Sequence, residues 1–291
     1  MKKQFLFIFS LLFLVQACAQ KAKTEQPDLS EISYTEKDAE IFEDILSKYK
    51  DEADKPIATL IPEIGKYFIG QEYVAHTLEV NEEEKLIVNL RELDCTTYAE
   101  NLLALARTLK SENQSFEQFA KEIEKIRYRD GDRNEYPSRL HYFSDWIYNN
   151  KDNDLVTTPA DSFGTVFPNK VSFMSNNPDS YKHLKNNPDY VSVIEQQEEE
   201  INSKDYFFVP KEKISEYEYL LKEGDIIGLT TSIDGLDVAH VGVLVEQNGK
   251  LHLLHASQSK LKVEISDEPI SSFLKPESKN TGIMIARPVE I

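Results

Sequence analysis

Residues 238–256 read Val-Ala-His-Val-Gly-Val-Leu-Val-Glu-Gln-Asn-Gly-Lys-Leu-His-Leu-Leu-His-Ala. Two short apolar runs flank the pair Asn248-Gly249. A two-residue type I′ turn needs positive φ at both central positions, and Asn-Gly tolerates this conformation best. The stretch therefore predicts a β-hairpin.

The turn also fixes which side chains share a face of this hairpin. Counting outward from it places Gly242 opposite His255 and Val245 opposite His252. Because strand side chains alternate between faces, His240 and His255 should be diagonal neighbours on one face, with β-carbons roughly 7 Å apart. His252 should point the other way. A slip of one residue on one strand would reverse this arrangement.

The wider pattern predicts an α+β fold, because helical periodicity dominates the first half and short β-rich runs dominate the C-terminal third. Helices are expected after Thr35, over Ile57–Ile69 and Cys95–Lys110, after Ser115, and over Arg139–Tyr148. Further strands are expected over Ile226–Leu229 and Gly282–Arg287. We expect a helical N-terminal half packed on a small antiparallel sheet. A helical and loop insertion is expected at about 111–204, with long loops after Asn149.

The helix expected from Cys95 begins at Asp94-Cys95-Thr96-Thr97. Asp94 is suited to cap it, and apolar residues then recur at helical spacing. The thiol of Cys95 should therefore lie at a helix N-terminus.

The N-terminus predicts export. Lys2 and Lys3 precede an apolar stretch too short to span a bilayer, which needs ~20 residues. The sequence ending at Cys18 resembles a bacterial lipobox, although Gln16 is a poorer match than a small residue. We expect residues 1–17 to be a lipoprotein signal peptide, Cys18 to carry lipid, 18–30 to be a flexible tether and 31–291 to form one domain. An ordinary secretory signal is the alternative.

If Cys18 carries lipid, Cys95 is the one remaining cysteine and no intramolecular disulfide can form. A free thiol in an oxidising compartment usually has a chemical role. The alternative is a buried cysteine that serves as a small apolar residue.

Composition argues against nucleic acid as a partner. The 291-residue chain has a formal net charge of -18, and its acidic runs are expected to form solvated faces. A lipid at Cys18 would make the membrane a partner instead.

The chemistry of these side chains predicts a thiol hydrolase that needs no cofactor. A helix N-terminus and a protonated imidazole both lower a thiol pKa from its usual value of ~8.5. Cys95 would be the nucleophile, and His240 the general base and acid. His255 would orient the His240 ring, and amide groups at the helix start would help bind the oxyanion.

Sequence blocks around these residues resemble, in order, those of the NlpC-type papain-like cell-wall cysteine hydrolases. The blocks are Asp94-Cys95-Thr96-Thr97, Gly224-Asp225-Ile226-Ile227, Ala239-His240-Val241-Gly242-Val243 and Leu254-His255-Ala256-Ser257. The segments starting at Tyr73 and Ser138 are similar to those of the N-acetylmuramoyl-L-alanine amidase-like branch. The resemblance covers about Ile64 to Pro288.

This resemblance implies a papain-like fold in which Cys95, His240 and His255 match the catalytic residues. Tyr73 matches the tyrosine that precedes the nucleophile block, so Tyr73 and Asp94 are expected to position the oxyanion site. Thr97 departs from the glycine usual in the wider superfamily.

The implied function is a cysteine amidase that cleaves peptidoglycan muropeptides between N-acetylmuramic acid and L-alanine. The alternatives are a γ-D-glutamyl-diamino acid endopeptidase of the cell wall and a non-catalytic wall-binding lipoprotein. In each case the expected location is the bacterial cell envelope, lipid-anchored in the periplasm.

For several other polar and aromatic residues, the sequence permits either a functional or a structural interpretation. Arg139 could bind a stem-peptide carboxylate or form a structural ion pair. Tyr142 and Trp146 could line a substrate wall or belong to the core. His76 with nearby acids, or His252 with His255, could suggest zinc, but neither has the H-E-x-x-H pattern, so no metal is expected.

Overall fold

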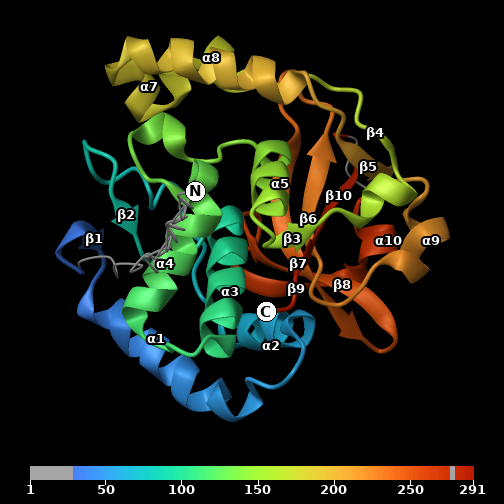
Figure 1. The fold of residues 1–291 in the computed structure, drawn as a ribbon. Helices are drawn as coiled ribbons and strands as arrows, with labels where there is room; N and C mark the ends of the chain where they lie inside the picture. The colour runs from blue at the N-terminus through green and yellow to red at the C-terminus, as the bar shows by residue number, and fades with distance from the viewer. Residues whose placement is uncertain (1–28, 276–278) are drawn as a thin grey trace, which may run out of the picture.

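The computed structural model describes residues 29–275 and 279–291. It is an α+β structure, as predicted, in which helices lie against a large antiparallel sheet (Figure 1). The predicted signal peptide, Cys18 and almost all of the tether lie outside the described residues. Within those residues, no helix is long and apolar enough to cross a bilayer.

The helices are α1 (Glu36–Tyr49), α2 (Ile57–Tyr67), α3 (Cys95–Lys110), α4 (Phe116–Arg127), α5 (Phe143–Asp152), α6 (Phe173–Asn176), α7 (Lys182–Asn186), α8 (Pro188–Asn202), α9 (Ile214–Tyr217) and α10 (Ile270–Phe273). The strands are β1 (Ile32–Ser33), β2 (Leu86–Ile87), β3 (Val156–Thr157), β4 (Thr165–Val166), β5 (Phe207–Pro210), β6 (Ile226–Thr231), β7 (Val238–Gln247), β8 (Lys250–Ser257), β9 (Lys262–Pro269) and β10 (Asn280–Pro288).

The large sheet has the order β4-β5-β10-β6-β7-β8-β9, and β3 pairs with β10. Its β7–β8 hairpin has the predicted register, with Gln247 opposite Lys250 and Val245 opposite His252. Asn248 and Gly249 both have positive φ, 53° and 74°, as the turn requires. The prediction missed β9 and β5, which extend the sheet on either side.

Helix α3 lies at the centre of the molecule and packs against α2, α4, β7 and β8 (Figure 1). Its bounds agree with the prediction, and every side chain from Thr97 to Leu109 is buried. Apolar side chains from both sides of this helix join one core cluster, including Tyr98, Leu102 and Leu105. The sheet and its neighbours therefore hold the N-terminus of α3 in place.

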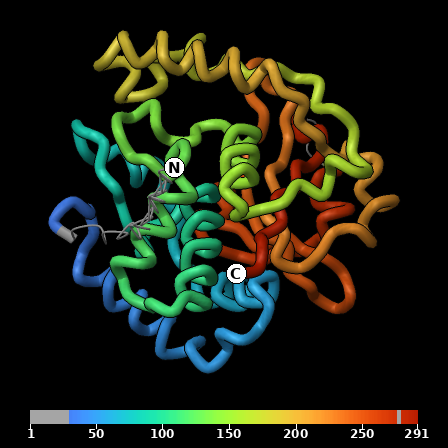
Figure 2. The backbone as a smooth tube through the Cα atoms, viewed as in Figure 1, coloured from blue at the N-terminus to red at the C-terminus, as the bar shows by residue number. Residues whose placement is uncertain are grey.

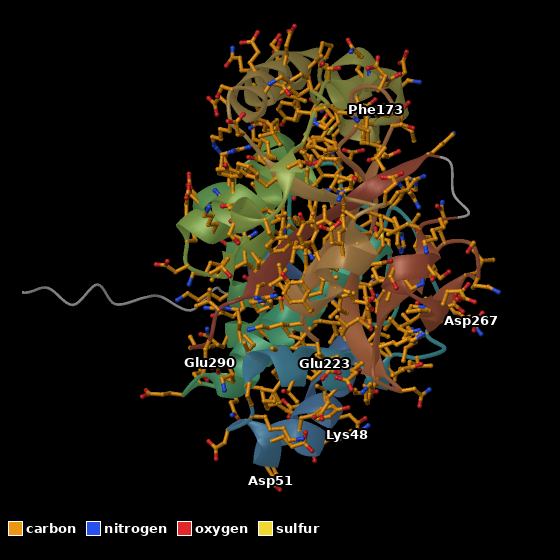
Figure 3. All side chains as sticks on the ribbon, turned by 90° about the vertical axis from the view of Figure 1, so that its right-hand side faces the viewer. Lys48, Asp51, Phe173, Glu223, Asp267 and Glu290 are labelled. Carbon is orange, nitrogen blue, oxygen red and sulfur yellow. The ribbon has the colours of Figure 1, made fainter. Side chains whose placement is uncertain are left out.

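The region predicted as an insertion, about 111–204, contains α4 to α8. Helices α7 and α8 form a layer at one end of the molecule, far from α1 (Figure 2). Seen from the side, Phe173 lies near that layer, and Lys48 and Asp51 mark the opposite end (Figure 3). The prediction missed α8, which spans 15 residues where long loops were expected.

The fifth predicted helix was placed four residues too early. Residues 139–142 are extended, with Arg139 bridged to Tyr128, and α5 begins at Phe143. Asp237 fixes this start, because its carboxylate accepts hydrogen bonds from the backbone N–H of Ser144 at 2.7 Å and from the Ser144 hydroxyl at 2.8 Å. A cap supplied by a distant segment leaves no local sequence signal.

Candidate active site

Cys95 is the first residue of α3, and a capping box holds the turn that presents it. Asp94 Oδ1 accepts a hydrogen bond from the Thr97 backbone N–H at 2.8 Å, and the Thr97 hydroxyl accepts one from the Asp94 N–H at 3.0 Å. Thr97, which departs from the family pattern, is therefore used to fix the start of the helix. A glycine there could not provide this hydroxyl.

The two histidines predicted to share a face are in direct contact. His240 Nε2 lies 2.6 Å from His255 Nδ1, and the ring planes are nearly perpendicular at 87°. His252 lies apart, with Nδ1 2.8 Å from the carbonyl oxygen of Ser266. The predicted pairing of His240 with His255 is confirmed.

Gly242 leaves room for this pair. A β-carbon at residue 242 would lie 2.8 Å from Leu253 Cδ1 and 3.0 Å from His255 Cβ. Any larger residue would therefore push on the strand that carries His255.

Cys95 and His240 line the same cavity of about 140 Å³. The N-terminal turn of α3 forms one wall, and residues of β7 with the segment just before it form another. Phe143 and Trp146 of α5 complete the cavity with aromatic side chains. A thiol and an imidazole far apart in the sequence thus line one cavity.

Burial shifts the pKa values of both Cys95 and His240. Burial raises the pKa of the Cys95 thiol to about 11, and the negative charge of Asp94 adds to this effect. The N–H of Val241 and the hydroxyl of Thr96 act in the opposite direction. Burial lowers the pKa of His240 to about 4. The expected lowering of the Cys95 pKa is therefore wrong for this structure, in which both pKa shifts favour a neutral thiol and a neutral imidazole at pH 7.

Tyr73 lies near Cys95. It bridges to Leu93 in the segment leading into α3, and the N–H of Val74 donates to the Leu93 carbonyl at 3.1 Å. Burial raises the pKa of Tyr73 to about 12, with further contributions from the charges of Cys95 and Asp94. The structure thus places Tyr73 and Asp94 beside Cys95, and neither of them lines the cavity.

Arg139 has a structural environment. Its guanidinium is buried and donates to Glu84 at 2.7 Å, to Glu79 at 2.7 Å and to the Leu78 carbonyl at 2.9 Å. This network ties the segment after Tyr73 to residue 139 and leaves Arg139 outside the cavity lining. The structural reading of Arg139 therefore fits the structure better than substrate binding.

The two aromatic candidates differ from each other. The Tyr142 hydroxyl is buried, donates to Glu198 at 2.6 Å and accepts from the Met174 N–H at 2.9 Å, so it joins α6 to α8. It does not line the cavity, whereas Trp146 does. The reading of Trp146 as a wall residue is compatible with the structure, although Trp146 also belongs to the core.

Sequence reasoning missed two carboxylates that line the cavity, Glu100 and Asp237. Both are almost fully buried. Burial raises the pKa of Glu100, and the charge of Arg127 opposes this shift. The sequence did offer one indication, because Glu100 is an acidic residue among the apolar side chains of the helix that begins at Cys95.

Within the described residues, no group of three or more His, Cys, Asp or Glu side chains is arranged to hold a metal ion. His76, one of the zinc candidates, is exposed and has positive φ of 63°.

A helix-and-sheet fold with a cavity lined by a thiol and an imidazole is compatible with a hydrolase. The sequence profile of the N-acetylmuramoyl-L-alanine amidase-like family matches residues 63–283. The chain belongs to this family. No protein with a curated description matches the sequence.

Solved structures agree with the family. A crystal structure of an N-acetylmuramoyl-L-alanine amidase from Bacteroides uniformis has 37% sequence identity and a TM-score of 0.77, covering 80% of this chain and 99% of that chain. A Bacteroides fragilis protein described as a candidate xylanase has 39% identity and a TM-score of 0.73, covering 77% and 98%. A Legionella pneumophila protein with 21% identity and a TM-score of 0.63, covering 86% and 95%, shares the fold.

Proposed function

We propose that this protein is a cysteine amidase with a papain-like fold of the NlpC type. It hydrolyses peptidoglycan fragments at the amide bond between N-acetylmuramic acid and L-alanine. One observation carries the proposal: Cys95 and His240 line one cavity, and His240 is bonded to His255 at 2.6 Å. The family and the name of the Bacteroides uniformis relative support the bond that is cut.

The imidazole pair supports a general-base mechanism. His240 Nε2 is occupied by His255, so Nδ1 is the nitrogen available to take the thiol proton. His240 must then carry its proton on Nε2 and donate it to His255 Nδ1. As Cys95 attacks the carbonyl carbon, its proton passes to His240 and then to the leaving amine, which departs as the C–N bond breaks. Water, which gives a proton to His240, then attacks the thioester, and the C–S bond breaks as His240 returns that proton to the Cys95 sulfur. His255 holds the ring throughout.

Three groups can stabilise the negative oxygen that forms during attack. The first N–H groups of a helix have no partners within the helix, so those of Cys95 and Thr96 are available. The Tyr73 hydroxyl stays protonated, because its pKa is raised to about 12, and it can donate as well. Asp94 acts indirectly by fixing the turn from which these N–H groups point.

The two carboxylates that line the cavity, Glu100 and Asp237, raise the alternative of a glycosidase, which the structure supports less well than a cysteine amidase. Most glycoside hydrolases need two carboxyl groups that can exchange protons or attack. Asp237 uses both oxygens, one for Ser144 and the other for the Val238 N–H at 2.7 Å. Glu100 is paired with Arg127 at 2.8 Å. The structure therefore favours the thiol as the reacting group over a carboxylate pair.

We further propose that lipid on Cys18 anchors the enzyme in the bacterial cell envelope, facing the periplasm. The lipobox-like sequence ending at Cys18 supports this location. Fragments released from the wall would then meet the enzyme at the membrane.

A muropeptide digest tests the function. Wild-type protein should release a free lactyl-sugar and an intact stem peptide, and Cys95→Ala should release neither. A truncated stem still attached to the sugar would instead identify the γ-D-glutamyl endopeptidase. Binding without cleavage by wild-type protein would identify the non-catalytic wall-binding protein. Mass spectrometry of the products separates the three outcomes.

A further inference from the structure

Glu100 lies one helical turn beyond the nucleophile. In a helix, residues four apart lie on the same face, which groups Cys95 with Ala99 and Thr96 with Glu100. All four of these residues line the cavity. The helix that presents the thiol therefore also presents a carboxylate to the same space.

One oxygen of this carboxylate is fixed. Glu100 is 3% exposed, and Oε2 accepts a hydrogen bond from Arg127 Nε at 2.8 Å. Arg127 is held in turn by donating to the Ile87 carbonyl at 2.7 Å. Both members of the ion pair are buried, so the carboxylate has little freedom to turn.

The other oxygen has no partner within the described part of the chain. Oε1 accepts no hydrogen bond there, and it is not among the polar atoms sealed away from solvent without a partner. Because Glu100 lines the cavity, Oε1 is available to a molecule that fills it. An occupant that displaces solvent from Oε1 must supply a hydrogen-bond donor, because a carboxylate oxygen left without one is costly.

We propose that Glu100 binds an amide N–H of the substrate beside the scissile bond and so determines specificity. This inference rests on the proposed amidase function. A muropeptide offers such a donor from two sources, the acetamido group of the muramoyl sugar and the second amide of the stem peptide. Asp237 is a poorer acceptor for either donor, since Ser144 and Val238 already occupy its oxygens.

The chain offers a matched control for the substitution Glu100→Gln. A second buried ion pair, Arg107–Glu122 at 2.7 Å, also joins α3 to α4. Glu122 does not line the cavity. Glu122→Gln therefore neutralises an equivalent buried carboxylate without touching the substrate.

The experiment measures kcat and KM for both variants on a native muropeptide. We expect Glu100→Gln to raise KM about 10-fold relative to Glu122→Gln, because a neutral acceptor binds the N–H more weakly than a carboxylate. Equal kinetics for the two variants would overturn the proposal. If Glu100→Gln does not fold, Glu100→Asp replaces it, since aspartate keeps the charge but draws the oxygens back by one methylene.

Two substrate analogues identify the donor. One lacks the acetamido group, and the other is N-methylated at the second stem amide. Wild-type protein should lose kcat/KM about 10-fold or more on one of them, and Glu100→Gln should lose much less on that same analogue. If both analogues keep their full penalty in Glu100→Gln, the proposal is wrong. Failure of wild-type protein to cleave the native muropeptide would reject the amidase function itself.

Discussion

At the scale of single residues, burial dominates the electrostatics of the site. Cys95 lies at a helix N-terminus, which favours a thiolate. Desolvation and the adjacent Asp94 carboxylate outweigh this effect and raise the thiol pKa to about 11. In the proposed mechanism, Cys95 and His240 are then both neutral before reaction, and the proton moves during attack rather than before it.

This balance predicts the effect of Asp94→Asn. Asparagine caps a helix about as well as aspartate, so the turn should persist while the negative charge disappears. The pKa of Cys95 should therefore fall below its value of about 11. Iodoacetamide labelling of Cys95, followed by mass spectrometry across pH 6 to 11, measures the shift. Glu92→Gln removes a nearby charge outside the capping box and should leave the profile unchanged; identical profiles for Asp94→Asn and wild type would contradict this account.

The neutral base also predicts how activity depends on pH. His240 must be unprotonated to accept the thiol proton, and burial holds its pKa at about 4. The rate constant kcat/KM should therefore rise as pH increases through about 4 and stay level near neutrality. A rate that instead rises through the usual histidine range, near ~6.5, would show that His240 is not held neutral by burial.

Replacing each hairpin histidine separates catalysis from stability. His255→Ala removes the partner that orients His240, so kcat should fall about 100-fold or more. His252→Ala breaks only the contact with Ser266 on the other face, so kcat should be largely retained although stability falls. His255→Asn should restore part of the rate. Steady-state kinetics on purified, folded variants decide the matter, and equal losses of kcat would refute separate roles.

At the scale of elements, the sequence predicted those features that neighbouring residues determine, namely the register of one hairpin and the bounds of one helix. The Asn-Gly turn and the alternation of side chains gave the register that joins His240 to His255. The cap and apolar stripe of α3 gave its bounds. Helix α8 lacks such signals, because Ile194, Glu198 and Ile201 are its only buried side chains and one of them is acidic. Its packing depends on the distant Tyr142.

The hairpin also depends on Gly242, which has no room for a β-carbon beside Leu253 and His255. Gly242→Ala places a methyl group against Leu253 and His255, which should displace His255 from His240 and lower kcat about 10-fold or more. Gly249→Ala is the control, because the turn glycine has no atom within 4 Å of the added carbon and only its φ of 74° is strained. Gly249→Ala should lower the melting temperature while kcat is retained. Unchanged kcat in Gly242→Ala would show that the strands can part without moving the pair.

At the scale of the whole molecule, the sequence predicted that Cys95 and His240 come together but not what surrounds them. The cavity takes Cys95 from α3, Trp146 from α5 and His240 from β7. The shift of each pKa depends on atoms brought together by all three elements. For this reason the sequence predicted which side chains would share the cavity but not the direction in which burial shifts their pKa values.

Helix α1 lies before the residues that match the family, yet it contacts the segment that leads into the candidate site. Asp38 of α1 is fully buried, and its carboxylate accepts hydrogen bonds from the Leu90 N–H at 2.8 Å and from Arg91 Nε at 3.0 Å. It also accepts bonds from the backbone and hydroxyl of Thr35, at 2.8 and 2.7 Å, which cap α1. One side chain thus fastens α1 to the segment that leads into Cys95.

Asp38→Asn should therefore weaken both the fold and the site. Asparagine cannot accept all of these bonds, and it leaves Arg91 without its buried charge partner, so the free energy of unfolding should fall by about 3 kcal/mol. Urea denaturation measures this loss, with Glu43→Gln on the exposed face of α1 as the control. Because the segment before Cys95 is loosened, labelling of the thiol by iodoacetamide should also become faster. If Asp38→Asn unfolds at the same urea concentration as Glu43→Gln, α1 does not stabilise the segment that carries the nucleophile.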